Sequence, residues 1–334
     1  MNNPPDSILN SMEEKLGEKV TVQPYKVSGG LADYCLLTGT SGRRFTAVFR
    51  EKPREMVLRD KDGNIYYRNL FLVEEESIRR LSKAGIAVPE ILHTGNNFII
   101  WPYLGENLAL DESFLSSSNR LDEIVLRILE YVAAIHNLPV HTISYSSCCT
   151  KYNLEFHFTL LNVIEQSNNE IAGNIKKAES YSRLHELIDN LPEPNFEDCV
   201  TKGQTYDPEI IFMGGDTMHH TDYTFTGRGN PLWDIVYPVS WGLPRGEDEA
   251  AAKKRERVRH YIRARKINNE QEMFVTFDYF TVLESLNMTD VLFGRNTEQA
   301  KILYTLARRN MENLISGNPE LNEVKEILLS SIPV

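Results

Sequence analysis

The most informative stretch of the chain is Thr221-Asp-Tyr-Thr-Phe-Thr-Gly-Arg-Gly-Asn-Pro-Leu-Trp-Asp-Ile-Val-Tyr237. The runs Glu209–Met213 and Met218–Tyr223, which lead into it, are rich in β-branched and aromatic residues, and Gly214-Gly215 lies between them. Such runs around a glycine turn predict two short strands. The glycines and the proline inside the stretch then end the strand pattern, and a new helix is expected near Trp233.

Upstream of this stretch, the first hundred residues predict a five-stranded sheet with one inserted helix. Short turns separate the β-branched and aromatic runs, which favours antiparallel pairing. The expected strands are Val20–Val27, Asp33–Thr38, Arg44–Arg50, Glu90–Thr94 and Asn97–Trp101. Apolar residues at helical spacing predict one helix over Ser7–Leu16 and another over Leu70–Ala84 that ends at Gly85. A polar loop is expected from Glu51 to Arg68.

After Gly105 the sequence is mostly helical. Helices are expected over Asp122–Asn137, over Asn153–Asn190 and over nearly everything from Asp248 onward. A sheet followed by a helical region indicates an α+β protein, and 334 residues suffice for a bilobal molecule. We expect residues 1–103 to form a sheet lobe and residues 104–334 to form a helical lobe.

The charge of the chain argues against nucleic-acid binding. The 47 acidic and 36 basic residues leave a formal net charge of −11, which repels a phosphate backbone overall. One basic run, Lys253–His260, continues to Lys266, but it lies between the acidic residues 247–249 and Glu270 in a helical pattern. We interpret this run as a solvated helix face and expect no nucleic-acid partner.

The sequence also favours a cytoplasmic protein without membrane contact. No apolar run approaches the ~20 residues of a membrane-spanning helix, and the first residues lack the basic and apolar regions of a signal peptide. The cysteines show no metal-ligand spacing and are expected to be reduced thiols. They are Cys35, Cys148, Cys149 and Cys199.

The order of these parts, a small sheet and then a helical lobe with an embedded hairpin, is similar to that of kinase-like phosphotransferases. At four places the residues resemble the aminoglycoside phosphotransferase and choline kinase superfamily, and the resemblance covers most of the chain. It implies a bilobal protein-kinase-like fold, with ATP or GTP and Mg²⁺ as cofactors. It also implies that the phosphate acceptor is a hydroxyl of a small molecule or peptide.

The first similar place is the opening hairpin, Val27–Leu37, and the following strand that ends in Arg50. In the family a glycine turn covers the nucleotide phosphates, because glycines let backbone amides approach them closely. The resemblance assigns phosphate binding to Arg50 and the orientation of this cation to Glu74. It assigns the glycine turn to Ser28, Gly29 and Gly30. The alternatives are a plain hairpin turn, a surface role for Arg50, and Glu75 or Glu76 in place of Glu74.

The next two places lie on either side of residue 105. Asn97–Gly105 resembles the family's hinge, where backbone groups meet adenine, and it assigns Trp101 and Tyr103 to the nucleotide site. The alternative is that both are plain core and turn residues. Tyr131–His136 resembles a family helix that ends in histidine, and we interpret His136 as a structural residue because it stands alone on an apolar face.

The fourth and closest match is the stretch quoted first, which resembles the family's metal segment. It implies that Asp222 binds Mg²⁺ between the nucleotide phosphates, since a hard cation prefers carboxylate oxygen. It also implies that Asp234 holds the catalytic loop by hydrogen bonds and does not touch substrate. The alternative for Asp222 is a turn or cap residue.

The resemblance fails at the catalytic loop. The family carries His-Gly-Asp-x-x-x-x-Asn, in which the aspartate accepts the proton of the attacking hydroxyl and the asparagine binds metal. Lys202, Gln204 and Glu209 stand at the His, Asp and Asn positions of this chain. Glutamine takes no proton near neutral pH, so Gln204 can only orient a nucleophile. Glu209 could still bind Mg²⁺, and Lys202 could contact a phosphate or an acidic acceptor.

Asp207 is the candidate for a displaced base, although the following Pro208 favours a plain turn. Three functions therefore stay open. Our main hypothesis is a nucleotide-binding phosphotransferase. The second is a pseudokinase that binds nucleotide or peptide and serves a partner protein as a regulatory or scaffolding subunit. The third is a kinase-like fold reused for another ligand, without nucleotide.

Overall fold

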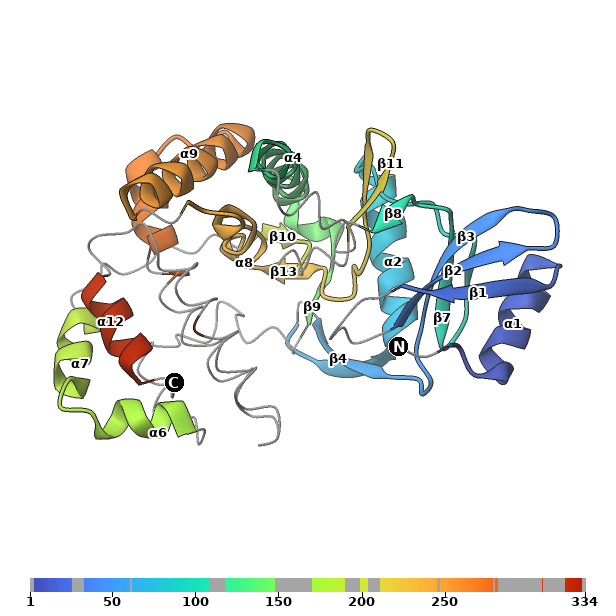
Figure 1. Ribbon diagram of the computed structural model, residues 1–334, viewed down its shortest axis with the longest axis horizontal. Helices are drawn as coiled ribbons and strands as arrows, with labels where there is room; N and C mark the ends of the chain where they lie inside the picture. The colour runs from blue at the N-terminus through green and yellow to red at the C-terminus, as the bar shows by residue number, and fades with distance from the viewer. Residues whose placement is uncertain are drawn as a thin grey trace. The chain divides into compact units, whose positions relative to one another are not determined.

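The structure of the chain is a computed structural model (Figure 1). It describes residues 3–25, 33–60, 62–107, 118–147, 170–189, 199–203, 211–244, 247–278, 280–281, 308 and 322–331. Helices and an antiparallel sheet are both present, so the molecule is α+β as expected. The chain divides into two compact units, each described separately below. The first unit comprises residues 1–121, 134–153 and 198–234, and the second comprises 122–133, 154–197 and 235–334.

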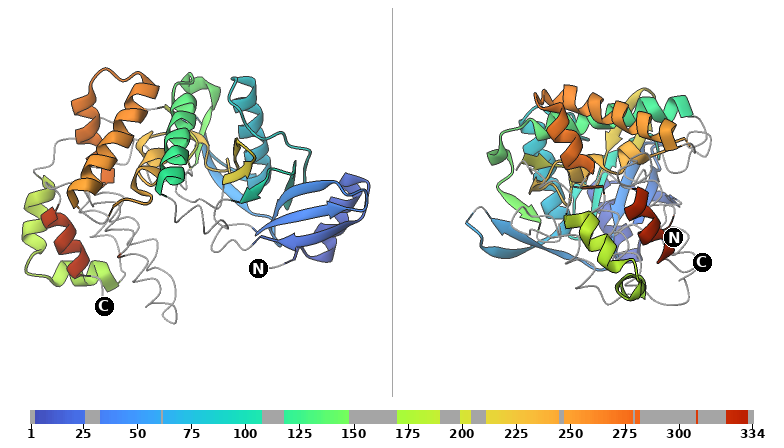
Figure 2. Two further views of the ribbon diagram at one scale, coloured as in Figure 1. Left: turned by 45° about the horizontal axis from the view of Figure 1, so that its top comes forward. Right: turned by 90° about the vertical axis from the view of Figure 1, so that its left-hand side faces the viewer.

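A five-stranded antiparallel sheet forms the core of the first unit and confirms the predicted one. Its strand order is β1-β2-β3-β7-β6. The strands are β1 (Val20–Pro24), β2 (Asp33–Gly39), β3 (Arg44–Phe49), β6 (His93–Thr94) and β7 (Phe98–Pro102). Helix α1 (Asp6–Leu16) lies along this sheet (Figures 1 and 2) and ends at Gly17, whose φ of +71° is left-handed.

Alternation along the strands gives the sheet two different faces. One face packs its apolar side chains against Ile8 and Met12 of α1, and it consists of Cys35, Leu37, Phe45, Ala47, Phe49, Phe98 and Ile100. The opposite face carries Tyr34, Thr46 and Trp101, which are also buried. Both faces are therefore covered, which explains why β2 and β3 read as nearly continuous buried runs.

Helix α2 (Leu70–Lys83) follows the sheet's first three strands and matches the predicted helix. Asn69 caps its N-terminus by accepting hydrogen bonds from the backbone N–H groups of Phe71 and Leu72. Its apolar residues recur at helical spacing and are buried on one side of the helix. That side also carries Glu74, which is only 2% exposed.

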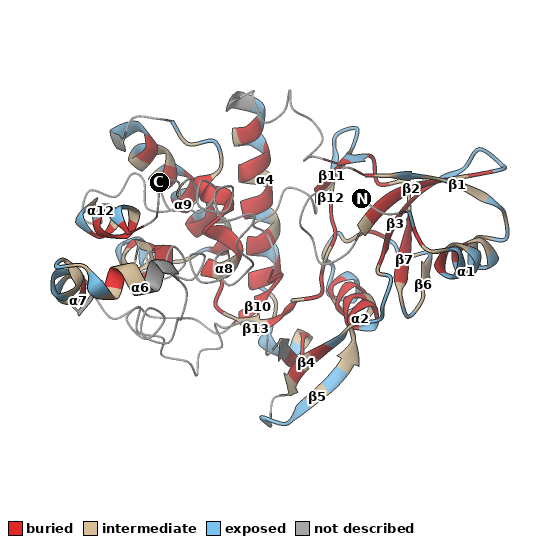
Figure 3. Ribbon diagram, turned by 60° about the horizontal axis from the view of Figure 1, so that its bottom comes forward, coloured by how far each residue is buried: buried red, intermediate tan, exposed pale blue. Residues whose placement is uncertain are grey.

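The predicted polar loop from Glu51 to Arg68 is wrong. It contains β4 (Glu55–Asp60) and β5 (Ile65–Asn69), which form an antiparallel hairpin that β9 (Tyr145–Ser147) joins in the order β5-β4-β9. Figure 3 shows β5 as mostly half-buried or exposed, and the right-hand view of Figure 2 shows the hairpin extending from the rest of its unit. Charged and polar residues on the open face conceal the alternation that buries Met56 and Leu58 on the other face.

The predicted hairpin around Gly214-Gly215 is present. It consists of β11 (Ile211–Gly214) and β12 (Thr217–His220), and β8 (Glu106–Asn107) pairs with β11. At Gly105, φ is +102° and a Cβ atom would lie 2.0 Å from the carbonyl oxygen of Met213. Only glycine fits there, because the two backbones touch.

The region around residue 230 differs in part from the prediction. The run Gly227–Gly229 was expected to break the strand pattern, yet it forms β13, which pairs with β10 (Cys199–Thr201). The expected helix near Trp233 is α8 (Leu232–Ile235). Its predecessor Asn230 caps it by accepting a hydrogen bond from the Leu232 N–H at 2.9 Å.

The described part of the second unit is helical, as predicted. It includes α6 (Glu170–Lys177), α7 (Tyr181–Asp189), η4 (Pro238–Ser240), α9 (Glu247–Arg265) and α12 (Asn322–Ser330). Helix α4 (Ser118–His136) contributes residues to both units, and η2 (Val140–Thr142) belongs to the first. Among the described helices, none combines the length and apolar composition of a membrane crossing.

The basic run in α9 is not simply a solvated face, and this expectation needs correction. Lys254, Arg257 and Arg265 are buried together with Val258 and other apolar residues of the same helix face. The buried guanidinium of Arg257 has its partners outside its own helix. Arg257 donates hydrogen bonds to the carbonyl oxygens of Val239 and Trp241 at 2.9 and 2.6 Å. The run thus builds the core as well as the surface.

Candidate functional site

Asp234 of α8 anchors the start of the loop that carries the predicted catalytic residues. Its carboxylate accepts hydrogen bonds from the backbone N–H groups of Lys202 at 2.6 Å and Gly203 at 2.7 Å. His136 of α4 lies 2.9 Å from the same carboxylate, and both side chains are fully buried. These are the hydrogen bonds that the sequence implied for Asp234, and they give His136 the structural role that was expected.

The same loop is fixed by contacts that the sequence analysis missed. At Gly203, φ is +85° and a Cβ atom would lie 2.2 Å from the Phe225 carbonyl oxygen, so only glycine fits. The carbonyl oxygen of Gly203 accepts a 2.6 Å hydrogen bond from the Trp233 indole N–H. Thr226 donates its hydroxyl to the carbonyl oxygen of Lys202 at 3.0 Å. The loop therefore begins from a rigid backbone.

The side chain of Lys202 points inward and is fully buried. Its ammonium donates a hydrogen bond to the backbone carbonyl oxygen of Asp222 at 3.0 Å and lies 5.0 Å from the centre of the Tyr223 ring. Burial lowers the pKa of Lys202 to about 8, although the carboxylates of Asp222, Asp234 and Glu74 act in the opposite direction. The expected contact with a phosphate or an acidic acceptor is thus replaced by an internal contact.

Asp222 has an unusual backbone conformation. Its φ is +56°, in the left-handed region, where most residues with a Cβ atom lose about 1–2 kcal/mol. Its side chain is half-buried. The preceding residue, Thr221, shares a 3.1 Å hydrogen bond between its hydroxyl and that of Tyr34 on β2. This bond connects the segment around Asp222 directly to the five-stranded sheet.

Glu74 reaches the segment around Asp222 from α2. Its carboxylate accepts a hydrogen bond from the backbone N–H of Tyr223 at 3.1 Å. Burial raises the pKa of Glu74, and the nearby carboxylate of Asp222 raises it further, while the Tyr223 N–H and Lys202 act against both. Among the described residues, no ion pair joins Glu74 to Arg50. The structure therefore gives the glutamate another partner than the one that the resemblance implied.

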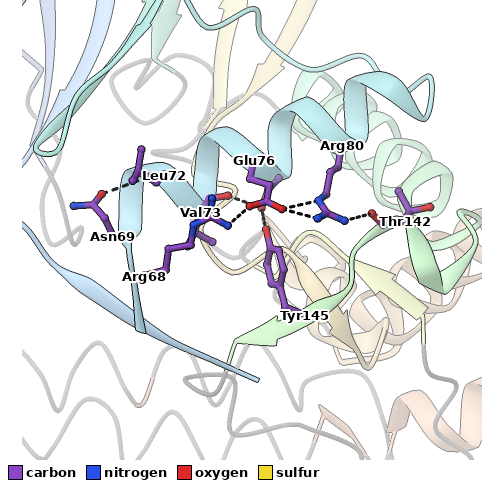
Figure 4. Close-up of polar contacts among 9 residues, drawn as sticks. Arg68, Asn69, Leu72, Val73, Glu76, Arg80, Thr142 and Tyr145 are labelled. Atoms are coloured by element: carbon purple, nitrogen blue, oxygen red, sulfur yellow. Dashed lines mark hydrogen bonds and ion pairs between the residues drawn. The ribbon is translucent and has the colours of Figure 1, made fainter. Parts of the chain in front are cut away.

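The two neighbouring glutamates do not replace Glu74. Glu75 pairs with Arg79 on the same helix at 2.5 Å. Glu76 pairs with Arg68 of β5 and with Arg80, at 2.6 Å from the latter (Figure 4). Of the three, only Glu74 has a carboxylate that accepts a hydrogen bond from the segment around Asp222. Which of the three glutamates orients Arg50 stays a prediction.

Arg50 directly follows β3. Its backbone N–H donates to the carbonyl oxygen of Asn97 at 2.9 Å. Partial burial and the charge of Arg54 lower the pKa of its guanidinium, and Asp33 acts against them. One nitrogen, Nη1, is buried and has no hydrogen-bond partner within the described part of the chain. A buried guanidinium nitrogen that lacks an acceptor suits an anionic ligand such as a phosphate.

The hinge residues divide into core and surface. Trp101 is fully buried, so its side chain belongs to the core, as the alternative held. Tyr103 is half-buried, donates its hydroxyl to the Glu106 carboxylate, and has the guanidinium of Arg44 3.8 Å above its ring. The backbone N–H of Leu104 donates to the hydroxyl of Thr46 at 3.1 Å. The contact of this segment with adenine stays a prediction.

Half of the predicted site residues lie outside the described residues. They are Ser28, Gly29, Gly30, Gln204, Asp207 and Glu209. Within the described part, no three His, Cys, Asp or Glu residues cluster as a metal site. Mg²⁺ keeps several waters and commonly takes only one or two protein carboxylates besides phosphate oxygens. The half-buried carboxylate of Asp222 fits this requirement as a single donor.

No protein-family model matches the sequence, and no curated protein matches it. Solved structures do resemble it. The macrolide 2′-phosphotransferase of Brachybacterium faecium has a TM-score of 0.56 at 13% identity, over 98% of each chain. Spectinomycin phosphotransferase in complex with ADP and spectinomycin has a TM-score of 0.56 at 10% identity, over 99% of each chain. A choline/ethanolamine kinase family protein of Mesorhizobium loti has a TM-score of 0.52 at 15% identity, over 97% of each chain.

At these identities the likeness is one of fold. The chain has the kinase-like fold of these phosphotransferases, over nearly its whole length. This confirms the fold expected from the sequence, and the proteins that share it are of the aminoglycoside phosphotransferase and choline kinase type that the motifs resemble. Fold alone does not establish an activity.

Proposed function

We propose that this chain binds ATP or GTP together with Mg²⁺ and transfers phosphate to a hydroxyl of a small molecule or peptide. The observation that carries the proposal is Asp222, a half-exposed carboxylate on a left-handed backbone that two buried charged residues hold in place. Its setting is a fold shared with phosphotransferases, one of which was solved with ADP and spectinomycin. A small-molecule acceptor is therefore the first class to test.

Each of these residues would have its own role in binding the metal and the nucleotide. Asp222 would hold Mg²⁺, with Glu209 as a second oxygen donor, and the metal would neutralise charge on the nucleotide phosphates. Arg50, through its buried unpartnered nitrogen, would pair with a phosphate oxygen. The turn Ser28–Gly30 would offer backbone N–H groups to the phosphates. Asp234 would keep the loop in place without touching substrate.

Gln204 limits the chemistry at the acceptor. It can orient a hydroxyl by hydrogen bonding but cannot accept its proton, and general-base catalysis typically contributes about 10²- to 10⁴-fold. Positioning and electrostatics supply most of phosphoryl transfer, so a slow reaction remains compatible with glutamine. Asp207 is the candidate for a displaced base.

The second candidate function is a pseudokinase that binds nucleotide or peptide and regulates or scaffolds a partner protein. The observation that favours it is the combination of Gln204 at the base position with an intact anchoring of the loop by Asp234. Such a protein would retain the nucleotide site and lose turnover. The two functions therefore differ in transfer, not in binding.

Nucleotide binding and transfer can be tested with Asp222→Ala. We expect the wild-type chain to bind Mg-ATP or Mg-GTP in calorimetry and the variant to lose at least tenfold in affinity, because the metal-bound phosphates lose their carboxylate. The control is Asp216→Ala, which alters an exposed turn between β11 and β12. Transfer is measured with labelled ATP and a panel of aminoglycosides, macrolides, choline and hydroxyl-bearing peptides.

Turnover that depends on Asp222 would support the phosphotransferase, and nucleotide binding without turnover would support the pseudokinase. The variant Gln204→Asp with Glu209→Asn restores the family residues and should then gain transfer if a missing base is the reason. Binding at a hundredfold the dissociation constant stabilises a protein by about 2.7 kcal/mol. Absence of any thermal shift at millimolar Mg-nucleotide would refute nucleotide binding and the phosphotransferase, and would leave a peptide-binding pseudokinase or a fold reused for another ligand.

A further inference from the structure

The two buried charged residues next to Asp222 act on a single peptide group. Lys202 donates its ammonium to the carbonyl oxygen of Asp222 at 3.0 Å. Glu74 accepts the N–H of Tyr223 at 3.1 Å. This oxygen and this N–H belong to the same peptide bond, between residues 222 and 223. Because they point in opposite directions across a trans peptide, the two side chains hold the bond from its two sides.

The charges match the peptide group that they hold. The carbonyl oxygen carries the negative end of the peptide dipole and meets a cation, whereas the N–H carries the positive end and meets a carboxylate. A flip of this peptide would turn its oxygen toward Glu74 and its N–H toward Lys202, so both contacts would become repulsive. Lys202 is fully buried and Glu74 is 2% exposed, so solvent screens these contacts little.

The held peptide fixes the direction of the Asp222 side chain. The φ of Asp222 is +56°, and its ψ is set by the orientation of the peptide that follows it. Together the two angles fix the Cα–Cβ bond, from which the carboxylate extends. A left-handed residue other than glycine persists only where its surroundings enforce the conformation. Lys202 and Glu74 provide that enforcement from two elements far apart in the sequence.

We propose that Lys202 and Glu74 form a charge-matched clamp on the 222–223 peptide, and that Lys202 is thereby a positioning residue for the metal-binding carboxylate. The clamp assigns the α2 glutamate to the metal segment instead of to Arg50. The consequence for metal binding rests on the proposed function, whereas the clamp itself does not. The two parts are therefore tested by separate measurements.

The clamp is tested without nucleotide by amide hydrogen exchange of Tyr223, measured by NMR and divided by the exchange rate of Ala47 at the centre of the five-stranded sheet. We expect Lys202→Met to raise this ratio at least tenfold, although Lys202 does not bond the Tyr223 N–H itself. Lys202→Arg keeps the charge and a donor and should stay within threefold of wild type. Lys254→Met removes another buried lysine from α9, in the other unit, and should leave the ratio unchanged.

An unchanged ratio in Lys202→Met, or an equal rise in Lys254→Met, overturns the clamp. If Lys202→Met does not fold, the double variant with Glu74→Gln removes both charges and should fold. If the two substitutions acted independently, their separate effects on the equilibrium constant for folding would multiply. The constant of the double variant should be at least tenfold above that product, because each single change leaves one buried charge unmatched. If Glu74→Gln folds and the double variant does not, Lys202 has a packing role and the clamp is rejected.

The positioning role is tested by the ratio of ADP dissociation constants without and with Mg²⁺. We expect Lys202→Met to reduce this ratio at least tenfold while ADP affinity without Mg²⁺ stays within threefold, because only the metal depends on the direction of the Asp222 carboxylate. Lys202→Arg should restore the ratio, and Lys254→Met should not change it. An equal loss with and without Mg²⁺ refutes the positioning role. If the wild type binds no ADP, the proposed function fails, and the exchange measurement still decides on the clamp.

Discussion

Two lysines are buried in the described part of the chain, and they differ in what surrounds their ammonium groups. Lys202 is near three carboxylates, those of Asp222, Asp234 and Glu74, which offset part of the cost of burial. Lys254 of α9 has Asp278 as its favourable charge, while Arg255 and Lys325 repel it. Burial lowers the pKa of Lys254 to about 7. At neutral pH the charged form of Lys254 is therefore less well stabilised than the charged form of Lys202.

Lys254→Met should stabilise the protein, and more so at low than at high pH. Below about pH 7 the folded protein carries a buried charged lysine, whereas at higher pH the folded state releases the proton and the unfolded state keeps it up to about pH 10.4. The unfavourable contribution of Lys254 is thus full below pH 7 and shrinks as the pH rises toward 10.4. Urea unfolding at about pH 6.5 and about pH 10 measures the difference in free energy of unfolding.

The control is Lys253→Met, which removes a neighbouring lysine that is 27% exposed and pairs with Asp122 at 2.8 Å. It should cost a little stability at both pH values. The assignment of a buried charge would be contradicted if Lys254→Met raised the free energy of unfolding equally at both pH values, or lowered it at the lower pH.

Helix α2 joins the three-stranded sheet of β5, β4 and β9 to the rest of the first unit. Figure 4 shows Glu76 between Arg68 of β5 and Arg80 of the same helix. The hydroxyl of the next residue, Ser77, lies 2.7 Å from that of Tyr145 on β9. The helix thus presents Glu74 to the candidate site and binds the hairpin with the residues that follow.

Glu76→Gln should weaken this attachment by about 1–2 kcal/mol, since two charge-assisted hydrogen bonds lose their charge while both arginines retain some access to water. Burial alone would raise the pKa of Glu76, but its bonds to Arg80 and Arg68 hold it below 4.5. The contribution is therefore present at neutral pH and should vanish as the pH falls through the lowered pKa. Chemical denaturation at two pH values measures it.

Glu75→Gln is the matched control, because Glu75 pairs with Arg79, whose side chain is 75% exposed. Its loss should be at most about 0.5 kcal/mol. Equal effects of the two substitutions at neutral pH would show that Glu76 is an ordinary surface pair and not an attachment of the hairpin.

At the scale of the whole molecule, the second unit depends on a buried cation of its own. Arg257 of α9 is 1% exposed. It donates to the carbonyl oxygens of Val239 and Trp241, and it pairs with Asp122 of α4 at 2.5 Å. One side chain thus joins α9 to α4 and to the segment that includes η4.

Arg257→Met should destabilise the chain by about 2–4 kcal/mol, because one buried and one partly buried carbonyl group lose their donor and the Asp122 carboxylate loses one of its two cations, keeping Lys253. Thermal unfolding followed by circular dichroism measures the effect. Arg259→Met is the control, since Arg259 and its partner Glu270 are each 50% exposed, and it should change stability by less than about 1 kcal/mol. A similar loss from both would contradict the structural role of Arg257.

Local residue patterns along the chain were sufficient for most of the fold. Runs of β-branched and aromatic residues between short turns predicted the five strands of the first sheet, and helical spacing predicted α1, α2, α4 and α9, because both patterns reflect how the side chains of one element are packed. The β4–β5 hairpin was predicted as a loop, because the polar residues on its open face and in its turn are typical of a loop. Motif resemblance predicted the hydrogen bonds by which Asp234 anchors the loop, whereas the metal role of Asp222 and the roles of Gln204 and Glu209 stay predictions.

The partners of the buried charges could not be read from the sequence. Nothing near Lys202 in the chain indicates that its ammonium turns inward, and nothing near Glu74 indicates that its carboxylate meets Tyr223 and not Arg50. Local patterns record the exposure of one segment, but the pairing of charges depends on which distant segments the fold brings together. Residues 74, 202 and 222 meet only after a helix, a loop and a strand end have packed around one peptide bond. The conformation of Asp222 follows from that packing, since its own preference is for the opposite sign of φ.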